Sequence, residues 1–144
     1  EVVGVYFSLG DDCIAMKSGK FYMGHKYKVS SRNVDIRQCY MRHGHGAVTL
    51  GSEIAAGVRH LSCKKCIFED TDRGLRVKTR RGRGEDSVVE DILFEDIMLP
   101  ENYSIYLRGF SEEHKIRNLC FQGGDLENCG QHMERMEFVE IKKT

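Results

Sequence analysis

Several features that mark other protein classes are absent from this sequence. Its 144 residues carry 22 basic and 22 acidic side chains, so the formal net charge is zero, which argues against a general nucleic-acid binder. No run approaches the roughly 18 apolar residues of a membrane-spanning helix, and the N-terminus lacks the charged, apolar and small-residue order of a signal peptide. We therefore expect no nucleic-acid partner and no membrane insertion.

The cellular location stays open at this point. Glu1 stands where an initiator methionine would be, so we expect a processed or partial product whose targeting signal lies elsewhere. The six cysteines could form three disulfides in an oxidising compartment. Several of them stand inside apolar runs, however, where a free cysteine behaves as a small hydrophobic residue. We expect these cysteines to be reduced and buried.

Proline is nearly absent, and so is the periodicity of long helices; Pro100 is the one proline. Short β-type runs recur instead, with Gly, Asn, Asp or charged residues between them, and this pattern predicts an all-β fold. The runs cover residues 2–7, 13–17, 34–40, 47–50, 58–61, 66–69, 75–79, 88–94, 104–107, 116–121 and 136–141.

The runs also follow a larger period of roughly 20 to 30 residues, which is typical of a solenoid. We predict a right-handed parallel β-helix with about five coils, forming one domain over residues 1–144. A β-sandwich would use Asn-Gly or Asp-Gly hairpin turns, and the sequence contains neither dipeptide. We further expect Cys39, Cys63 and Cys120 to form part of a ladder inside the solenoid.

Polar residues recur at one phase of the predicted coils. Asp11 and Asp12 occupy the turn before the second strand of the first coil, and His45 holds that phase in the second coil. In the third coil the same turn leads to Arg76 and Lys78, which are two residues apart and so leave one face of the strand. Stacked strands lie about 4.8 Å apart, so these groups should converge within about 10 Å, the size of one or two sugar rings.

Each of these features alone is more typical of a solvated turn or strand face, and their shared phase is what indicates a site. The motifs are Gly10-Asp11-Asp12-Cys13-Ile14-Ala15, Gly44-His45-Gly46 followed by Val48 and Gly51-Ser52-Glu53, and the stretch 73–84 around Arg76 and Lys78. In order and approximate spacing they resemble the polygalacturonase family of glycoside hydrolases, family 28, over about residues 1 to 98.

The resemblance implies a right-handed parallel β-helix that hydrolyses α-1,4-galacturonide links in pectin with inversion at the anomeric carbon. It implies that Asp11 is the general acid, that Asp12 is part of the base that activates water, and that His45 supports the proton of the acid. By the same resemblance, Arg76 and Lys78 hold the substrate carboxylate. Members of the family are mostly exported, whereas the cysteine usage of this chain suits a reducing cytoplasm.

The residue types suit these roles. An inverting glycosidase needs one protonated and one ionised carboxyl group with room for a water molecule between them. A planar guanidinium can bind a carboxylate through two hydrogen bonds, and an ammonium adds a point charge. We expect no metal or cofactor, because the pair Cys63 and Cys66 has the spacing of half a zinc site and no second pair completes it.

The sequence departs from the family pattern on both sides of these motifs. The family's Asn-Thr-Asp motif, whose acid shares the base role, does not occur in the residues before Asp11. After residue 98 the usual further coils are shortened, and Tyr103 is the candidate for the family's substrate-binding tyrosine. We therefore expect a fragment of a longer enzyme or a shortened relative, with open coil ends that favour self-association.

Two functions remain open from the sequence. The first is hydrolysis of a pectin-type polymer or oligosaccharide, of endo or exo type and on homogalacturonan or rhamnogalacturonan. The second is a non-catalytic β-helix module that binds anionic polysaccharide or associates with itself, because the upstream acid is lacking. The basic run 80–83 fits either an extension of the groove for an anionic polymer or packing between coils.

Overall fold

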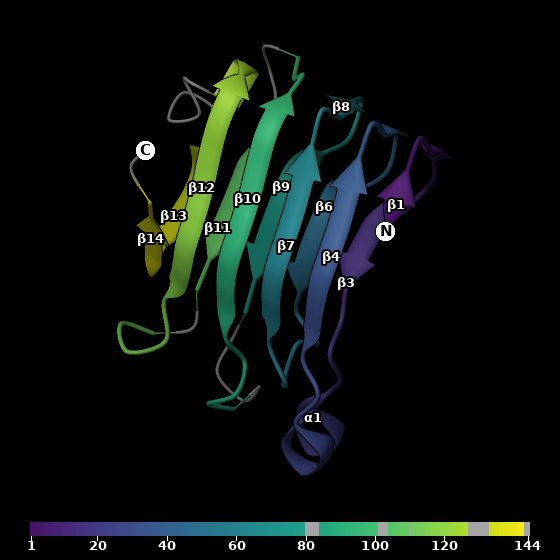
Figure 1. Ribbon diagram of the computed structural model, residues 1–144. Helices are drawn as coiled ribbons and strands as arrows, with labels where there is room; N and C mark the ends of the chain where they lie inside the picture. Colours follow the sequence, from purple (N-terminus) through teal and green to yellow (C-terminus); the bar gives the residue numbers. More distant parts are fainter. Residues whose placement is uncertain (80–83, 101–103, 110, 127–132, 143–144) are drawn as a thin grey trace.

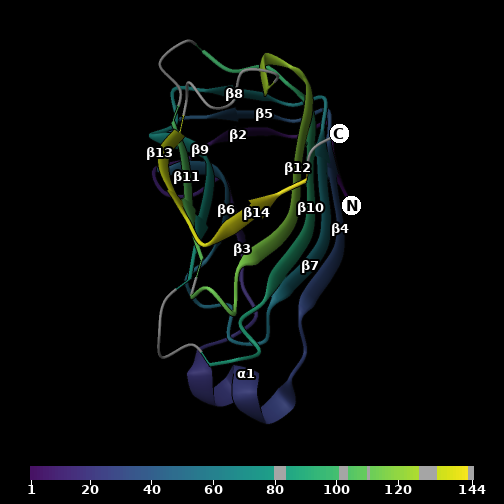
Figure 2. The same cartoon turned by 90° about the vertical axis from the view of Figure 1, so that its left-hand side faces the viewer.

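The chain forms a parallel β-solenoid, seen in a computed structural model that describes residues 1–79, 84–100, 104–109, 111–126 and 133–142. It passes in turn through three sheets, and every paired strand runs parallel to its neighbours. Figure 1 views the six-stranded sheet from the front, and Figure 2 shows the three sheets edge-on around a common core. The prediction of a parallel β-helix is confirmed, and parallel pairing excludes the hairpin-linked sandwich.

The three sheets differ in length along the stack. The six-stranded sheet has the order β1 (Val2–Val3), β4 (Ser31–Arg37), β7 (Val58–Lys64), β10 (Val89–Ile97), β12 (Ile116–Gly124) and β14 (Val139–Ile141). The five-stranded sheet has the order β13 (Met133–Glu137), β11 (Ile105–Arg108), β9 (Arg73–Lys78), β6 (Gly46–Gly51) and β3 (Ile14–Met16). The three-stranded sheet consists of β2 (Tyr6–Ser8), β5 (Tyr40–Arg42) and β8 (Ile67–Glu69).

About three turns of the solenoid therefore contribute a strand to all three sheets. Later turns contribute β10 with β11, then β12 with β13, and finally β14, within the part of the chain that the structure describes. A single parallel bridge between Ile67 and Met98 continues the three-stranded sheet into the fourth turn. The first strand, β1, and the last, β14, lie at opposite ends of this stack (Figure 1).

The core lies between the sheets and is built from residues of equal phase. Ile36, Cys63, Phe94 and Phe121 occupy one register position on four consecutive strands of the six-stranded sheet. The first three of these are at most 1% exposed. Repeating an apolar residue at this phase extends one continuous core through the stack, which a single coil could not bury alone.

The cysteines stack differently from the predicted ladder. Cys39 stands one coil from Cys66 at a corner of the solenoid, whereas Cys63 faces the core, and Cys120 pairs with Leu93 instead. The ladder prediction was wrong because the register separates these positions. The expectation of free thiols holds for the five described cysteines, of which four are buried and Cys120 is half-buried.

Each turn leaves the six-stranded sheet through a residue in the left-handed backbone conformation. Gln38, Lys65 and Asp96 have φ angles of 53°, 52° and 52°, and Gly4 and Gly123 take the same position with φ of 65° and 67°. A residue with positive φ redirects the chain sharply, so this position forms a corner of the solenoid at every turn. Two of the five corners, Gln38 and Lys65, use residues for which this conformation is unfavourable.

One helix, α1 (Phe21–Tyr27), follows β3 and was not predicted from the sequence. It projects beyond the edge of the sheets, as Figure 2 shows. Gly24 packs directly on the neighbouring coil, since a Cβ atom there would lie 2.5 Å from Cβ of Ala55. Lys28 ends the helix in the left-handed conformation, with its N–H donating to the Gly24 carbonyl. No helix among the described residues is long and apolar enough to cross a membrane.

The corner conformation predicts the effect of a glycine at residue 65. Lys65→Gly removes the Cβ strain of a left-handed residue and should raise the free energy of unfolding by about 0.5–1 kcal/mol. Lys64→Gly, one residue earlier on strand β7, should instead lower it by about 1 kcal/mol through lost strand propensity. Chemical denaturation of both variants measures the difference, and equal losses in the two would contradict the left-handed corner.

Candidate active site

The predicted site residues meet on the outer face of the five-stranded sheet and in the turns that lead into it. The backbone ladder continues past the strand ends, because His45 N–H donates to the Asp11 carbonyl at 3.2 Å and Arg73 N–H to the His45 carbonyl at 3.0 Å. The turn that carries the acid pair is therefore stacked directly on the turn that carries His45. This is the convergence that the shared phase predicts.

The two neighbouring carboxylates are held in different environments. Asp11 is exposed, and its Oδ1 accepts the backbone N–H of Asp12 at 2.8 Å. Asp12 is half-buried, and its Oδ1 accepts the hydroxyl of Thr49 at 2.8 Å. Thr49 is completely buried, so its hydroxyl holds the Asp12 carboxylate in place. The two carboxylates therefore have different hydrogen-bond partners and different exposure.

The glycines beside His45 allow this close stacking. A Cβ atom on Gly44 would lie 2.1 Å from the Asp11 carbonyl oxygen, and Gly44 also has a φ of 91°. A Cβ atom on Gly46 would lie 2.3 Å from the Thr49 hydroxyl and 2.9 Å from Oδ1 of Asp12. Both glycines therefore make room for the neighbouring coil and for the hydrogen bond to Asp12.

His45 is oriented by a carboxylate from the third coil. Its Nδ1 lies 2.8 Å from Oδ2 of Asp72, and both side chains are more than half exposed. Because an ionised carboxylate only accepts hydrogen bonds, this contact places a proton on Nδ1 and leaves Nε2 available to another group. The other histidine of the motif, His43, contacts the hydroxyl of Ser8 instead.

Arg76 and Lys78 project from β9 beside these groups. Among the residues that the structure describes, neither side chain forms an ion pair, and Nε of Arg76 is buried without a hydrogen-bond partner. Burial, followed by the neighbouring Arg76 guanidinium, lowers the pKa of Lys78, while the charges of Asp12 and Asp11 oppose that shift. Two cations with unused donors next to two acids form a polar surface suited to an anionic ligand.

Tyr106 lies one coil beyond Arg76, and three guanidinium groups lie near its ring. The guanidinium carbons of Arg73, Arg76 and Arg135 are 5.1, 5.9 and 5.8 Å from the ring centroid. Arg73 forms a bidentate pair with Glu134 at 2.7 Å for both bonds, and Arg135 pairs with a carboxylate of its own strand at 2.6 Å. Among the residues that the structure describes, Arg76 is the one of these three arginines that forms no ion pair.

Two sequence predictions lie outside the described residues: Tyr103 and the basic run 80–83. Two residues of the site were missed, Thr49 as the partner of Asp12 and Asp72 as the partner of His45. Alternation along residues 47–50 could have placed Thr49 on the outer face.

No cluster of metal-binding side chains occurs in the described part of the chain, and Cys63 and Cys66 contact each other with sulfurs 3.8 Å apart.

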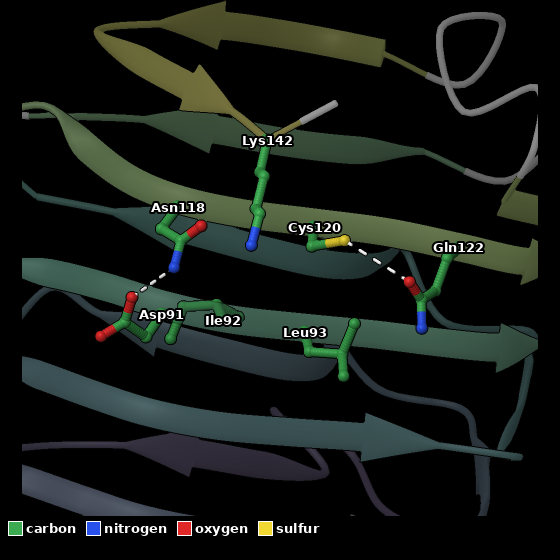
Figure 3. A pocket seen from close by; sticks show the side chains of 7 residues that line it. All are labelled: Asp91, Ile92, Leu93, Asn118, Cys120, Gln122 and Lys142. Carbon is green, nitrogen blue, oxygen red and sulfur yellow. Dashed lines mark hydrogen bonds between the residues drawn. The ribbon is translucent and has the colours of Figure 1, made fainter. Parts of the chain in front are cut away.

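A hollow lies on the outer face of the six-stranded sheet (Figure 3). It has a volume of about 310 Å³ and is lined by Asp91, Ile92, Leu93, Asn118, Cys120, Gln122 and Lys142. Its polar groups largely contact one another, since Asn118 donates to Asp91 and the Cys120 thiol lies 3.8 Å from the Gln122 amide oxygen. We therefore place the candidate active site on the five-stranded sheet.

Comparisons with known proteins show what the chain is similar to. The family model for glycosyl hydrolases family 28 matches residues 1–108. A probable polygalacturonase of Vitis vinifera is 34% identical over 88 residues, which are 60% of this chain and 18% of that protein. An exopolygalacturonase of Arabidopsis thaliana is 28% identical over 109 residues, covering 73% of this chain and 21% of the relative.

An exo-poly-alpha-D-galacturonosidase of Dickeya chrysanthemi is 36% identical over 73 residues, covering 51% of this chain and 12% of that enzyme. The chain thus spans about a fifth or less of the length of these relatives. The family match covers all the motifs from the acid pair to β11. This chain belongs to glycosyl hydrolases family 28.

Proposed function

We propose that this chain carries acid, base and substrate-binding groups for inverting hydrolysis of α-1,4-galacturonide linkages in pectin-type polysaccharide. The observation that supports this most directly is that two carboxylates with different hydrogen-bond partners act electrostatically on Lys78, beside Arg76, and that neither cation has an ion-pair partner in the described residues. The family and the polygalacturonase names of the relatives give the same reaction class. A galacturonate ring has one carboxylate, which the cations can bind.

In this proposal Asp11 protonates the leaving glycosidic oxygen, and Asp12 helps to remove a proton from the attacking water. The exposed position of Asp11 allows it to reach a ligand, while Thr49 holds Asp12 in one orientation. His45, held by Asp72, stands close to Asp11 and supports its protonated state. Inversion requires the water to attack from the face opposite the leaving group, with about 6.5–9.5 Å between the two carboxyl groups.

Arg76 and Lys78 bind and orient substrate. The guanidinium of Arg76 can take a carboxylate through two parallel hydrogen bonds, using a donor that is otherwise unsatisfied. Lys78 adds a point charge two residues along the same strand. Fixing the sugar ring next to Asp11 and Asp12 turns the reaction into one between positioned groups, which is a large part of the catalysis available to such a site.

The sequence also favours a second candidate, a module that binds anionic polysaccharide without cleaving it. The observation behind it is that Arg76 and Lys78, neighbouring cations that form no ion pair among the described residues, could bind an anionic polymer whether or not the acids cleave it. Release of reducing ends from polygalacturonate by the wild-type chain separates the two. No release, together with binding that Arg76→Ala abolishes, would support the binding module and exclude hydrolysis by this chain.

The acid assignment predicts the behaviour of Asp11→Asn. Without a proton donor, turnover of polygalacturonate should fall by on the order of a thousandfold, while affinity for the polymer stays within about twofold. Reducing-sugar release and equilibrium binding measure the two quantities. Asp91→Asn, on the outer face of the other sheet, is the control and should keep the wild-type rate. An unchanged rate in Asp11→Asn would refute the assignment.

The hydrogen bond to Asp12 predicts a specific role for Thr49. Thr49→Val keeps the shape of the side chain but removes the hydroxyl, so kcat should fall about tenfold and the acid limb of the pH–rate profile should move. Thr49→Ser should restore most of the rate. Thr79→Val is a matched control, because Thr79 is equally buried and its hydroxyl contacts the Arg108 carbonyl at 3.4 Å. The same loss in Thr79→Val would show a general stability effect.

The lowered pKa of Lys78 predicts how binding depends on pH. A lysine is cationic only below its pKa, so the charge of Lys78 is lost at a lower pH than the ordinary value of 10.5. Affinity for oligogalacturonate should therefore decline as the pH rises toward 10.5 from below. In Lys78→Arg the decline should be smaller, because arginine stays charged over this range. Titration in the Asp11→Asn background measures this, and identical profiles would contradict the role of Lys78.

A further inference from the structure

A row of equivalent positions crosses the outer face of the five-stranded sheet. It lies two residues further along each strand than the row that contains Arg76. Met16 pairs with Leu50, and Gly51 pairs with Lys78, so Lys17, Gly51 and Lys78 stand at the same phase of three consecutive coils. Resting on the proposed function, we infer that Lys17 is a second carboxylate-binding residue, which takes a different ring of the same uronate chain than Lys78 does.

Gly51 keeps the space between the two lysines free of a side chain. A Cβ atom at Gly51 would lie 2.0 Å from the carbonyl oxygen of Lys78, so the close approach of the coils requires glycine there. The strand that carries Gly51 separates Lys17 from Lys78 by two coil spacings, about 10 Å along the solenoid axis. A polymer with a carboxylate on every ring can meet both ammonium groups when it runs along this row.

The ammonium of Lys17 is positioned but retains donors for a ligand. Its Nζ donates to the Gly51 carbonyl at 2.7 Å, and Glu53 lies 4.0 Å away. An ammonium has three N–H donors, so the bond to Gly51 holds Lys17 in the row and leaves other donors for a ligand. Glu53 is shared, because Lys20 approaches its other oxygen at 3.8 Å. One carboxylate for two lysines leaves positive charge on this part of the surface.

The charge of Lys17 also acts on a residue of the candidate active site, Lys78. This charge lowers the pKa of Lys78, after the larger effects of burial and of Arg76. The side chain of Lys17 is 43% exposed, so a ligand can reach it from solvent. The arrangement therefore offers one carboxylate position at Arg76 and Lys78 and another at Lys17. A polysaccharide with free carboxylates on neighbouring rings should therefore bind better than one whose neighbouring rings are esterified or neutral.

The test uses the full chain carrying Asp11→Asn, so that the probe is not cleaved. The probes are tetragalacturonate and galacturonic acid, with equilibrium binding measured at low and high salt. Lys17→Met should weaken tetragalacturonate binding by about five- to tenfold and reduce its salt dependence, while binding of the single sugar changes less than twofold. Lys20→Met is the matched control, since Lys20 contacts the same Glu53 but stands outside the row. It should bind both probes as the parent does.

Lys17→Arg keeps a cation at the position and should retain most of the affinity, which guards against a loss caused by altered packing. Equal tetragalacturonate affinity in Lys17→Met and the parent, with a loss in Lys78→Met, would overturn the role of Lys17 and leave the proposed function standing. An equal loss in Lys17→Met and Lys20→Met would also overturn it, because the effect would then be general surface charge. A parent chain that binds neither probe would defeat the proposed function itself and this inference with it.

Discussion

The backbone hydrogen bonds between consecutive parallel coils are the constraint on which the rest of the molecule depends. They fix which residues share a phase, so Ile36, Cys63 and Phe94 fall together inside the core. The same ladder runs on into the turns, where it sets His45 against Asp11. Side chains alternate between the two faces of a strand, so a slip of one residue would exchange core and site. Site geometry and core packing are therefore consequences of a single register.

The register in turn depends on corners that the sequence does not reveal. Lys65 follows Gln38 by 27 residues and precedes Asp96 by 31, and all three adopt the same left-handed conformation. The difference in coil length lies in the loops, and the left-handed residue keeps the same register position in each coil. Strand periodicity made the β-helix and most strand positions predictable, but Gln and Lys carry no signal for positive φ, and a single Asp is only a weak one. The helix α1 was missed because seven residues are too few for a helical period to show.

The candidate site was predictable to the extent that its residues stand in short motifs at matching phases. The turns that carry the acid pair and His45 stack as expected, and Arg76 and Lys78 share a face of β9. Their partners were not predictable, because a partner is chosen by contact across coils. Thr49 reads as an ordinary strand residue until stacking brings it under Asp12, and this contact exists only because Gly46 has no side chain. Lys17 becomes significant for the same reason, through its place opposite Gly51.

The two faces of the solenoid differ in how their charged side chains are paired, and this difference favours ligand binding on one of them. On the six-stranded sheet, basic residues meet acids on the next coil, as Arg59 meets Glu90 at 2.6 Å. On the five-stranded sheet the flanking arginines are paired as well, which leaves Arg76 and Lys78 as neighbouring cations without such partners among the described residues. Placing like charges together is unfavourable, and the lowered pKa of Lys78 is one sign of it. The nearby carboxylate of Asp12 offsets part of this cost but is already held by Thr49. A bound anion would relieve the remainder, so an arrangement of like charges that is unfavourable by itself favours the binding of an anionic ligand.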